Sequence, residues 1–210
     1  MTQIHFELAR FLSRVVFTAM NIRCTLRGEE NLPKDDAPVV LALNHASILD
    51  PPLVWAVCPR PIYFVTKAEF HKVPVFGTAS ARVGNIGIRR GQMDRGAITR
   101  SIDYVTRLRR SIGVFIEGTR SPDGELRPGK NGSALLVLKT GAPVVPAYIG
   151  GTFDVWPRHA LLPGWRRELT LTLGPVLRYP REDEHPGKER LAQIAAEITA
   201  AIARLKPGTL

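Results

Sequence analysis

A histidine and an aspartate five residues apart are the first side chains that could do chemistry together. They are His45 and Asp50, in the stretch NHASILD at residues 44–50. A histidine exchanges a proton near neutral pH, and a neighbouring carboxylate can hold its ring and stabilise its protonated form. Such a pair can take a proton from a substrate hydroxyl. The spacing alone is a weak signal, because Asp50 could instead cap a helix and His45 could be a hydrogen-bonded core residue.

A second cluster of polar residues lies in FIEGTRS, at residues 115–121. Glu117 stands at the end of an apolar run and is followed by Gly118, Thr119 and Arg120. The glycine lets the backbone approach a ligand closely, and the planar guanidinium can donate two hydrogen bonds to one phosphate. We therefore expect an anion-binding turn. The alternative is a solvated loop in which Arg120 pairs with a nearby carboxylate.

Further basic residues end two other apolar runs. Lys67 ends PIYFVTK, and Arg89 and Arg90 end GNIGIRR at residues 84–90. Adjacent residues of a strand point to opposite faces, so we expect at most one of the two arginines to face a site.

The elements that must position these residues alternate between strand and helix. Buried strands are expected at 38–43, 61–66, 83–90, 113–117 and 143–149. Helices are expected at 50–57, from Asp94 to Arg110, at 133–140 before Gly141, and at 190–205. Residues 23–28 alternate like a short strand, and 168–173 like an edge strand. The order predicts a single α/β domain with a mainly parallel or mixed sheet flanked by helices, and it places 44–50 in a strand-to-helix loop.

The first 22 residues form an amphipathic segment. Its polar residues recur at three and four positions: Gln3, Glu7, Arg10 and Arg14. The rest is a wide apolar arc: Phe6, Leu8, Phe11, Leu12, Val15, Val16, Phe17 and Met20. We expect residues 1–22 to be an interfacial helix lying in a membrane surface, beside an α/β domain at 23–210. A terminal helix docked on the body of the protein is the alternative.

The composition and the motifs exclude several classes of protein. With 44% hydrophobic residues, the 210-residue chain can bury a core, and no apolar run is long enough to span a bilayer. The formal charge of +10 favours negatively charged partners such as phosphate esters or anionic lipids. The arginines are too scattered to indicate nucleic-acid binding. Neither a serine-hydrolase motif nor a zinc motif occurs, and the GxxxxGK match at 124–130 lacks the Ser or Thr that would bind magnesium.

Taken in chain order, the motifs resemble the glycerolipid acyltransferase family over residues 35–155. The family pattern NHxxxxD is matched by Asn44, His45 and Asp50, and FxEGTRS by residues 115–121. Residues 84–90 and the run VVPAY at 144–148 occupy the places of the second and fourth blocks. Several motifs in order are far more specific than one. A mild departure is Gly87, which stands where the family commonly has a bulkier residue.

The resemblance implies transfer of a fatty acyl group from acyl-CoA or acyl carrier protein to the free hydroxyl of lysophosphatidic acid, in phospholipid biosynthesis. His45 would be the general base and Asp50 its orienting partner. The implied substrate-binding residues are Lys67, Arg90, Glu117, Gly118, Thr119 and Arg120. No metal and no cofactor besides the thioester donor is implied. The expected location is peripheral, on the cytoplasmic face of the cell membrane.

Two other functions stay open at this point. The acceptor could be another lyso-lipid such as a lyso-ornithine lipid, because the motifs specify the reaction better than the substrate. The chain could also be a basic membrane-binding protein that has the fold without turnover. If it is an enzyme, direct attack by the acceptor hydroxyl is expected rather than an acyl-enzyme, since no serine or cysteine lies in a recognised nucleophile motif.

Overall fold

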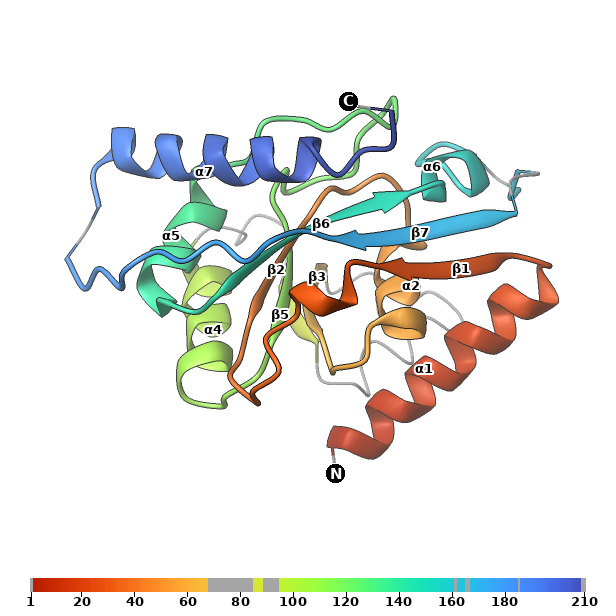
Figure 1. Cartoon of the computed structure of the whole chain (residues 1–210), viewed down its shortest axis with the longest axis horizontal. Helices are drawn as coiled ribbons and strands as arrows, with labels where there is room; N and C mark the ends of the chain where they lie inside the picture. Colours follow the sequence, from red (N-terminus) through yellow and green to blue (C-terminus); the bar gives the residue numbers. More distant parts are fainter. Residues whose placement is uncertain are drawn as a thin grey trace.

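The computed structural model describes residues 2–67, 85–88, 95–160, 162–164, 167–184 and 186–208. The strands are β1 Arg23–Arg27, β2 Val40–Leu43, β3 Tyr63–Lys67, β4 Ile86–Ile88, β5 Ile112–Phe115, β6 Val144–Gly150 and β7 Glu168–Leu173. The helices are α1 Thr2–Ala19, α2 Asp50–Val57, α4 Arg95–Thr106, α5 Asn131–Thr140, α6 Thr152–Val155 and α7 Lys188–Ala203, with a short 3₁₀ turn η1 at Glu29–Asn31. They form a single α/β domain (Figure 1).

Within the described residues the strands form one seven-stranded sheet in the order β1-β7-β6-β2-β5-β3-β4. All neighbours are parallel except β6 and β7, so the predicted mainly parallel or mixed sheet is confirmed. Because β2, β5 and β6 run in the same direction, the loops that follow them leave from the same edge of the sheet. The first two of these loops are residues 44–49 and 116–130, and the third begins at Gly151, contains the short helix α6 and is described to Ala160.

The helices cover both faces of the sheet. On one side α1 packs against α2, close to β1 and β7; on the other α4, α5 and α7 pack in series, with α7 over β6 and β2 (Figure 1). Connections between parallel strands are right-handed, which requires α2 and α5 to lie on opposite faces. The core between the layers contains large, fully buried side chains such as Trp55, Phe64, Leu41, Leu43 and Ile112.

The prediction of an edge strand at 168–173 is wrong. β7 lies inside the sheet, between β1 and β6. Its alternating pattern reflects one buried and one partly covered face, as the burial along β7 shows. Alternation of apolar and polar residues shows which face of a strand is covered. Whether β7 lies at the edge of the sheet depends instead on its pairing with β1, which is far away in the sequence.

Helix α1 divides its apolar residues between two sides. Phe6, Ala9 and Phe17 are buried, and the guanidiniums of Arg10 and Arg14 donate to backbone carbonyls at the end of α2, to Cys58 and Ala56 at 2.8 Å each. Cations at a helix C-terminus complement its dipole. These two arginines of the polar side therefore face the protein. A second apolar row is exposed and consists of Ile4, Leu8, Phe11 and Val15.

None of the helices in the described ranges is both long enough and apolar enough to cross a membrane. The exposed row of α1 recurs at intervals of three and four residues, so it forms one continuous stripe along the helix. Helix α1 thus docks on the body of the protein with one side and presents an apolar row on the other.

Two helix ends were predicted with different success. Helix α5 ends at Thr140 and Gly141 follows with φ 60°, as its glycine indicated. Helix α4 was expected to reach Arg110 but ends at Thr106. The chain turns there, with Arg109 in the left-handed region at φ 52°. The predicted cap at Asp94 lies outside the described residues.

Candidate active site

The loop between β2 and α2 begins with a side chain that continues the sheet. The Asn44 amide Nδ2 donates to the Ile149 carbonyl at 3.0 Å, and the Ile149 N–H donates to Asn44 Oδ1 at 2.7 Å. Strand β2 has ended at Leu43, yet β6 continues to Gly150, so the asparagine supplies the partner that the β2 backbone no longer provides. This pair fixes where the chain leaves the sheet and enters the loop.

Asp50 organises the rest of that loop through one oxygen. Its Oδ2 lies 2.7 Å from His45 Nδ1 and also accepts the backbone N–H groups of Ala46 at 2.8 Å and Ser47 at 2.9 Å. The side chain of Asp50 is fully buried, at 0% exposure. Because a carboxylate only accepts hydrogen bonds, the proton of the ring lies on Nδ1, and Nε2 carries the lone pair that can accept a proton.

The alternative that Asp50 caps helix α2 is not realised. Asp50 is the first helical residue, Leu49 occupies the N-cap position, and no side-chain cap hydrogen bond forms. The prolines that follow, Pro51 and Pro52, have no N–H to be capped. The Asp50 carboxylate therefore turns back toward the loop, where Ala46 and Ser47 offer N–H groups.

The ring of His45 lies flat on that of Phe115. Their centroids are 3.8 Å apart and the rings are inclined by 13°. Phe115 ends β5 and pairs in register with Leu43, which ends β2, so the two rings come from adjacent strand ends. Phe64 of β3 stacks in turn on Phe115 at 5.4 Å. The His45 side chain is 19% exposed, so solvent or a substrate can reach it.

The backbone of His45 is held by the second motif. Its N–H donates to Glu117 Oε1 at 3.0 Å, and its carbonyl accepts the N–H of Ser121 at 2.7 Å. Gly118, with φ 67°, lets the chain reverse between these two contacts. The turn at 116–121 therefore wraps the residue that carries the imidazole.

Glu117 is a buried carboxyl beside the loop that carries His45. It is 3% exposed, and its second oxygen, Oε2, has no hydrogen-bond partner within the part of the chain that the structure describes. Burial raises the pKa of Glu117 to about 7, the hydrogen bond from the His45 N–H lowers it, and the nearby charge of Asp50 raises it. The protonated acid is thus well populated near neutral pH.

Arg120 is half-buried near Asp50. Burial lowers the pKa of its guanidinium, the positive charge of Arg158 lowers it further, and the Asp50 carboxylate acts in the opposite direction. Among the described residues Arg120 forms no ion pair with Glu117 or Asp123, and Asp123 instead accepts from the Ser121 hydroxyl at 2.7 Å and from Arg127 at 3.2 Å.

The structure brings most of the predicted site residues together. His45, Asp50, Glu117, Gly118 and Arg120 meet where the loops after β2 and β5 leave the sheet. Thr119 belongs to the same turn and is exposed. Arg90 lies outside the described residues. Lys67 ends β3, but its side chain is not described.

Three residues of the site had no predicted role. Phe115 and Ser121 stand inside the FxEGTRS pattern, so the motif itself was the signal that could have found them. Ser47 donates through its hydroxyl to the Trp156 carbonyl at 2.6 Å and ties the loop after β2 to the loop after β6. The contact between residues 47 and 156 has no sequence signal.

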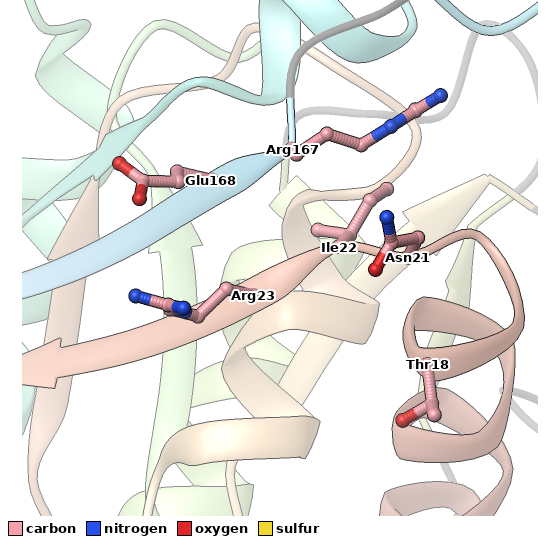
Figure 2. A pocket seen from close by; sticks show the side chains of 6 residues that line it. All are labelled: Thr18, Asn21, Ile22, Arg23, Arg167 and Glu168. Atoms are coloured by element: carbon pink, nitrogen blue, oxygen red, sulfur yellow. The ribbon is translucent and has the colours of Figure 1, made fainter.

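A separate pocket of about 370 Å³ lies where α1 turns into β1 (Figure 2). It is lined by Thr18, Asn21, Ile22, Arg23, Arg167 and Glu168. None of the candidate site residues lines this pocket. The chemistry is therefore assigned to the surroundings of His45.

Comparison with known proteins agrees with this geometry. Residues 23–150, more than half of the chain, match the protein family described as Acyltransferase. A chloroplastic 1-acyl-sn-glycerol-3-phosphate acyltransferase from Brassica napus is 35% identical over 136 residues, which is 63% of this chain and 38% of that protein. A protein of the same name from Pseudomonas aeruginosa is 28% identical over 207 residues, covering 96% of this chain and 76% of its own.

A solved structure is similar over nearly the whole chain. The 1-acyl-sn-glycerophosphate acyltransferase PlsC from Thermotoga maritima has a TM-score of 0.75 and 25% sequence identity, and the match covers 96% of this chain and 80% of that one. The chain spans only 38% of the length of the Brassica napus relative and 64% of that from Borreliella burgdorferi.

Proposed function

This chain belongs to the acyltransferase family, and we propose that it transfers a fatty acyl group from a thioester donor to the free hydroxyl of 1-acyl-sn-glycerol-3-phosphate. The product is phosphatidic acid. The acceptor is the one named in the relatives from plants and bacteria. The donor is acyl-CoA or acyl carrier protein.

The contact between His45 and Asp50 is the observation on which the proposal rests. With Nδ1 bonded to Asp50 at 2.7 Å, Nε2 takes the proton from the acceptor hydroxyl as its oxygen attacks the thioester carbonyl. A C–O bond forms and a tetrahedral intermediate develops. When the C–S bond breaks, the proton on Nε2 neutralises the departing thiolate. Asp50 stabilises the imidazolium that exists between these two proton transfers.

We propose that the basic residues of the site bind the phosphate of the acceptor. Arg120 leaves the turn that also holds the His45 backbone, so a phosphate bound there lies beside the base. Lys67 and Arg90 are proposed as additional phosphate ligands on the motifs alone. Glu117, Gly118 and Thr119 shape the turn, with Glu117 holding the His45 N–H.

We further propose that the exposed stripe of α1 rests in the membrane interface. Ile4, Leu8, Phe11 and Val15 form an apolar row, and a helix with such a row gains free energy by burying it among acyl chains. The formal charge of +10 adds attraction to anionic lipid. The acceptor and product are lipids, so a peripheral position on the cytoplasmic face of the cell membrane would bring the site to its substrate.

A panel of acceptors tests the proposed reaction. Purified protein is incubated with acyl-CoA and, separately, with lysophosphatidic acid, a lyso-ornithine lipid and monoacylglycerol, and products are identified by mass spectrometry. The proposal predicts phosphatidic acid as the main product. A preference for the lyso-ornithine lipid would change the acceptor but not the reaction. No thioester cleavage with any acceptor, alongside intact vesicle binding, would mean that the protein only binds membranes.

A further inference from the structure

The loop after β6 reaches the catalytic loop and has no assigned role. Strand β6 is parallel to β2, so residues 151–160 leave the same edge of the sheet as His45. Their connection is direct, because the Ser47 hydroxyl donates to the Trp156 carbonyl at 2.6 Å. Ser47 is itself fixed by its N–H bond to Asp50 at 2.9 Å. Trp156 is therefore joined by one hydrogen bond to the loop that holds the base.

A tight turn follows Trp156 and presents Arg158. The Trp156 indole donates to the Ala160 carbonyl at 3.0 Å, and the Ala160 N–H donates to the Pro157 carbonyl at 3.2 Å. These two bonds close the turn around Arg158, whose side chain is exposed. Proline at 157 restricts the backbone just before it. The backbone position of Arg158 is thus set by this turn and by the anchor of Trp156 on Ser47.

The charges of Arg158 and Arg120 are close enough to act on each other, and Asp50 is the nearby negative charge that acts on Arg120. In the described ranges neither guanidinium has an ion-pair or hydrogen-bond partner. Burial is the main reason why the pKa of Arg120 is lowered, and the positive charge of Arg158 lowers it further. Elsewhere on the same loops arginines are paired, as Arg127 is with Asp123 at 3.2 Å. Two adjacent unpaired cations cost free energy that a bound anion would recover.

We propose that Arg158 and Arg120 together bind the phosphate of the acceptor, Arg120 from the side of His45 and Arg158 from the loop after β6. The inference rests on the function proposed above and adds a residue from outside its motifs. A phosphate monoester carries up to two negative charges and three oxygens, so two arginines can share it. In 1-acyl-sn-glycerol-3-phosphate the free hydroxyl is on the carbon next to the one that bears the phosphate. Holding that phosphate between the arginines directs the hydroxyl toward the loop that contains His45.

Arg158→Gln tests the proposal by steady-state kinetics with lysophosphatidic acid and acyl-CoA. Loss of a charge-assisted contact is expected to raise KM for the acceptor roughly 10- to 100-fold, with KM for acyl-CoA unchanged. Turnover of monoacylglycerol, which lacks the phosphate, should be the same in the variant and the parent protein. Arg158→Lys, which keeps the charge but loses the planar fork, should have a smaller effect. The control is Arg107→Gln, an exposed arginine after α4 at the opposite edge of the sheet, and it should change neither KM.

Kinetics with two acyl donors show whether Arg158 binds the phosphate of the acceptor or the phosphates of CoA. If Arg158 instead binds the phosphates of CoA, the variant will raise KM for acyl-CoA but not for acyl-pantetheine, which lacks the nucleotide. That result would overturn the assignment to the acceptor, as would unchanged KM values for both substrates.

Calorimetric titration with inorganic phosphate separates this inference from the function. It needs no turnover, and binding by the parent protein should weaken roughly 10-fold or more in Arg158→Gln and in Arg120→Gln. If the parent protein transfers no acyl group but phosphate binding still depends on both arginines, the proposed reaction fails and the two-arginine site stands. If turnover is normal and phosphate binding is unchanged in Arg158→Gln, only the proposal of a two-arginine site fails.

Discussion

His45 Nδ1 and Asp50 Oδ2 are 2.7 Å apart, and the same carboxylate oxygen accepts the N–H groups of Ala46 and Ser47. One oxygen thus orients the ring and shapes the loop that carries it. Its neighbour, Oδ1, is buried and has no hydrogen-bond partner among the described residues. The negative charge of Asp50 is therefore directed at His45 and the two N–H groups.

Asp50→Asn should separate charge from geometry. An amide oxygen in the place of Oδ2 can still accept the two backbone N–H groups, so the loop should persist. The imidazolium formed during the reaction loses its counter-charge, and kcat should fall by about 10²- to 10⁴-fold with little change in KM. Kinetics and a thermal unfolding curve of the same sample measure both properties. A variant with normal kcat would show that the carboxylate charge has no role in catalysis.

Phe115→Leu should loosen the imidazole without removing any polar group. The flat ring contact at 3.8 Å is lost, so His45 can leave its position more easily. Because small errors in orientation are costly to rate, kcat should fall on the order of 10-fold at unchanged KM, with about 1 kcal/mol lost in stability. Phe64→Leu is the matched control, since Phe64 is buried and touches Phe115 but not the histidine ring. An equal loss of kcat in both variants would argue against a specific role for the stack.

Glu117→Gln should change how stability depends on pH. Burial raises the pKa of Glu117 from 4.5 to about 7, so the folded state favours the neutral acid. Its stabilising contribution is complete below pH 4.5, declines as the pH rises, and is lost above about pH 7. At 1.36 kcal/mol per pKa unit the change is about 3 kcal/mol.

Urea unfolding of both proteins between pH 4.5 and 8 measures this effect. The free energy of unfolding of the parent protein, relative to that of Glu117→Gln, should fall by about 3 kcal/mol across the interval. Other titrating groups cancel in the difference. A difference that stays constant with pH would mean that folding does not shift the pKa of Glu117.

Two phenylalanines of α1 should respond in opposite ways. Phe11 is 62% exposed on the apolar row, whereas Phe6 is buried against the body. Phe11→Ser should leave stability within about 0.5 kcal/mol and weaken binding to anionic vesicles roughly 10-fold. Phe6→Ala should cost about 3–5 kcal/mol of stability. Vesicle sedimentation and thermal unfolding record both, and full vesicle binding by Phe11→Ser would contradict a membrane role for the row.

Much of the fold was predictable because local signals determine it. Helix α2 has the predicted bounds, Asp50–Val57, since two prolines open it, and α5 ends at the glycine that favours a left-handed turn. The place of β7 was not predictable, because pairing with β1 joins residues far apart in the sequence. Whether α1 docks on the body could not be decided from the sequence for a related reason. Its arginines donate hydrogen bonds to backbone carbonyls at the end of α2, and no local sequence pattern predicts that contact.

In the candidate site too, some residues were predictable from local patterns and others depend on tertiary contacts. The meeting of His45 with Asp50 follows from a short spacing within one loop, and Arg120 follows from its motif. The use of Glu117 to hold the His45 N–H depends on two loops that leave adjacent strands. Arg158 stands in no motif and reaches the site only because β6 is parallel to β2. Tertiary contacts of this kind have no signature in a single sequence.

The central claim is that His45 removes the proton from the acceptor hydroxyl, and His45→Ala tests it most directly. Formation of phosphatidic acid from acyl-CoA and lysophosphatidic acid is measured by mass spectrometry. His159→Ala, an exposed histidine in the loop after β6, serves as the control. With a base removed, the rate should fall by about 10²- to 10⁴-fold while the melting temperature and phosphate binding are retained. Turnover by His45→Ala at the rate of the parent protein would contradict the mechanism.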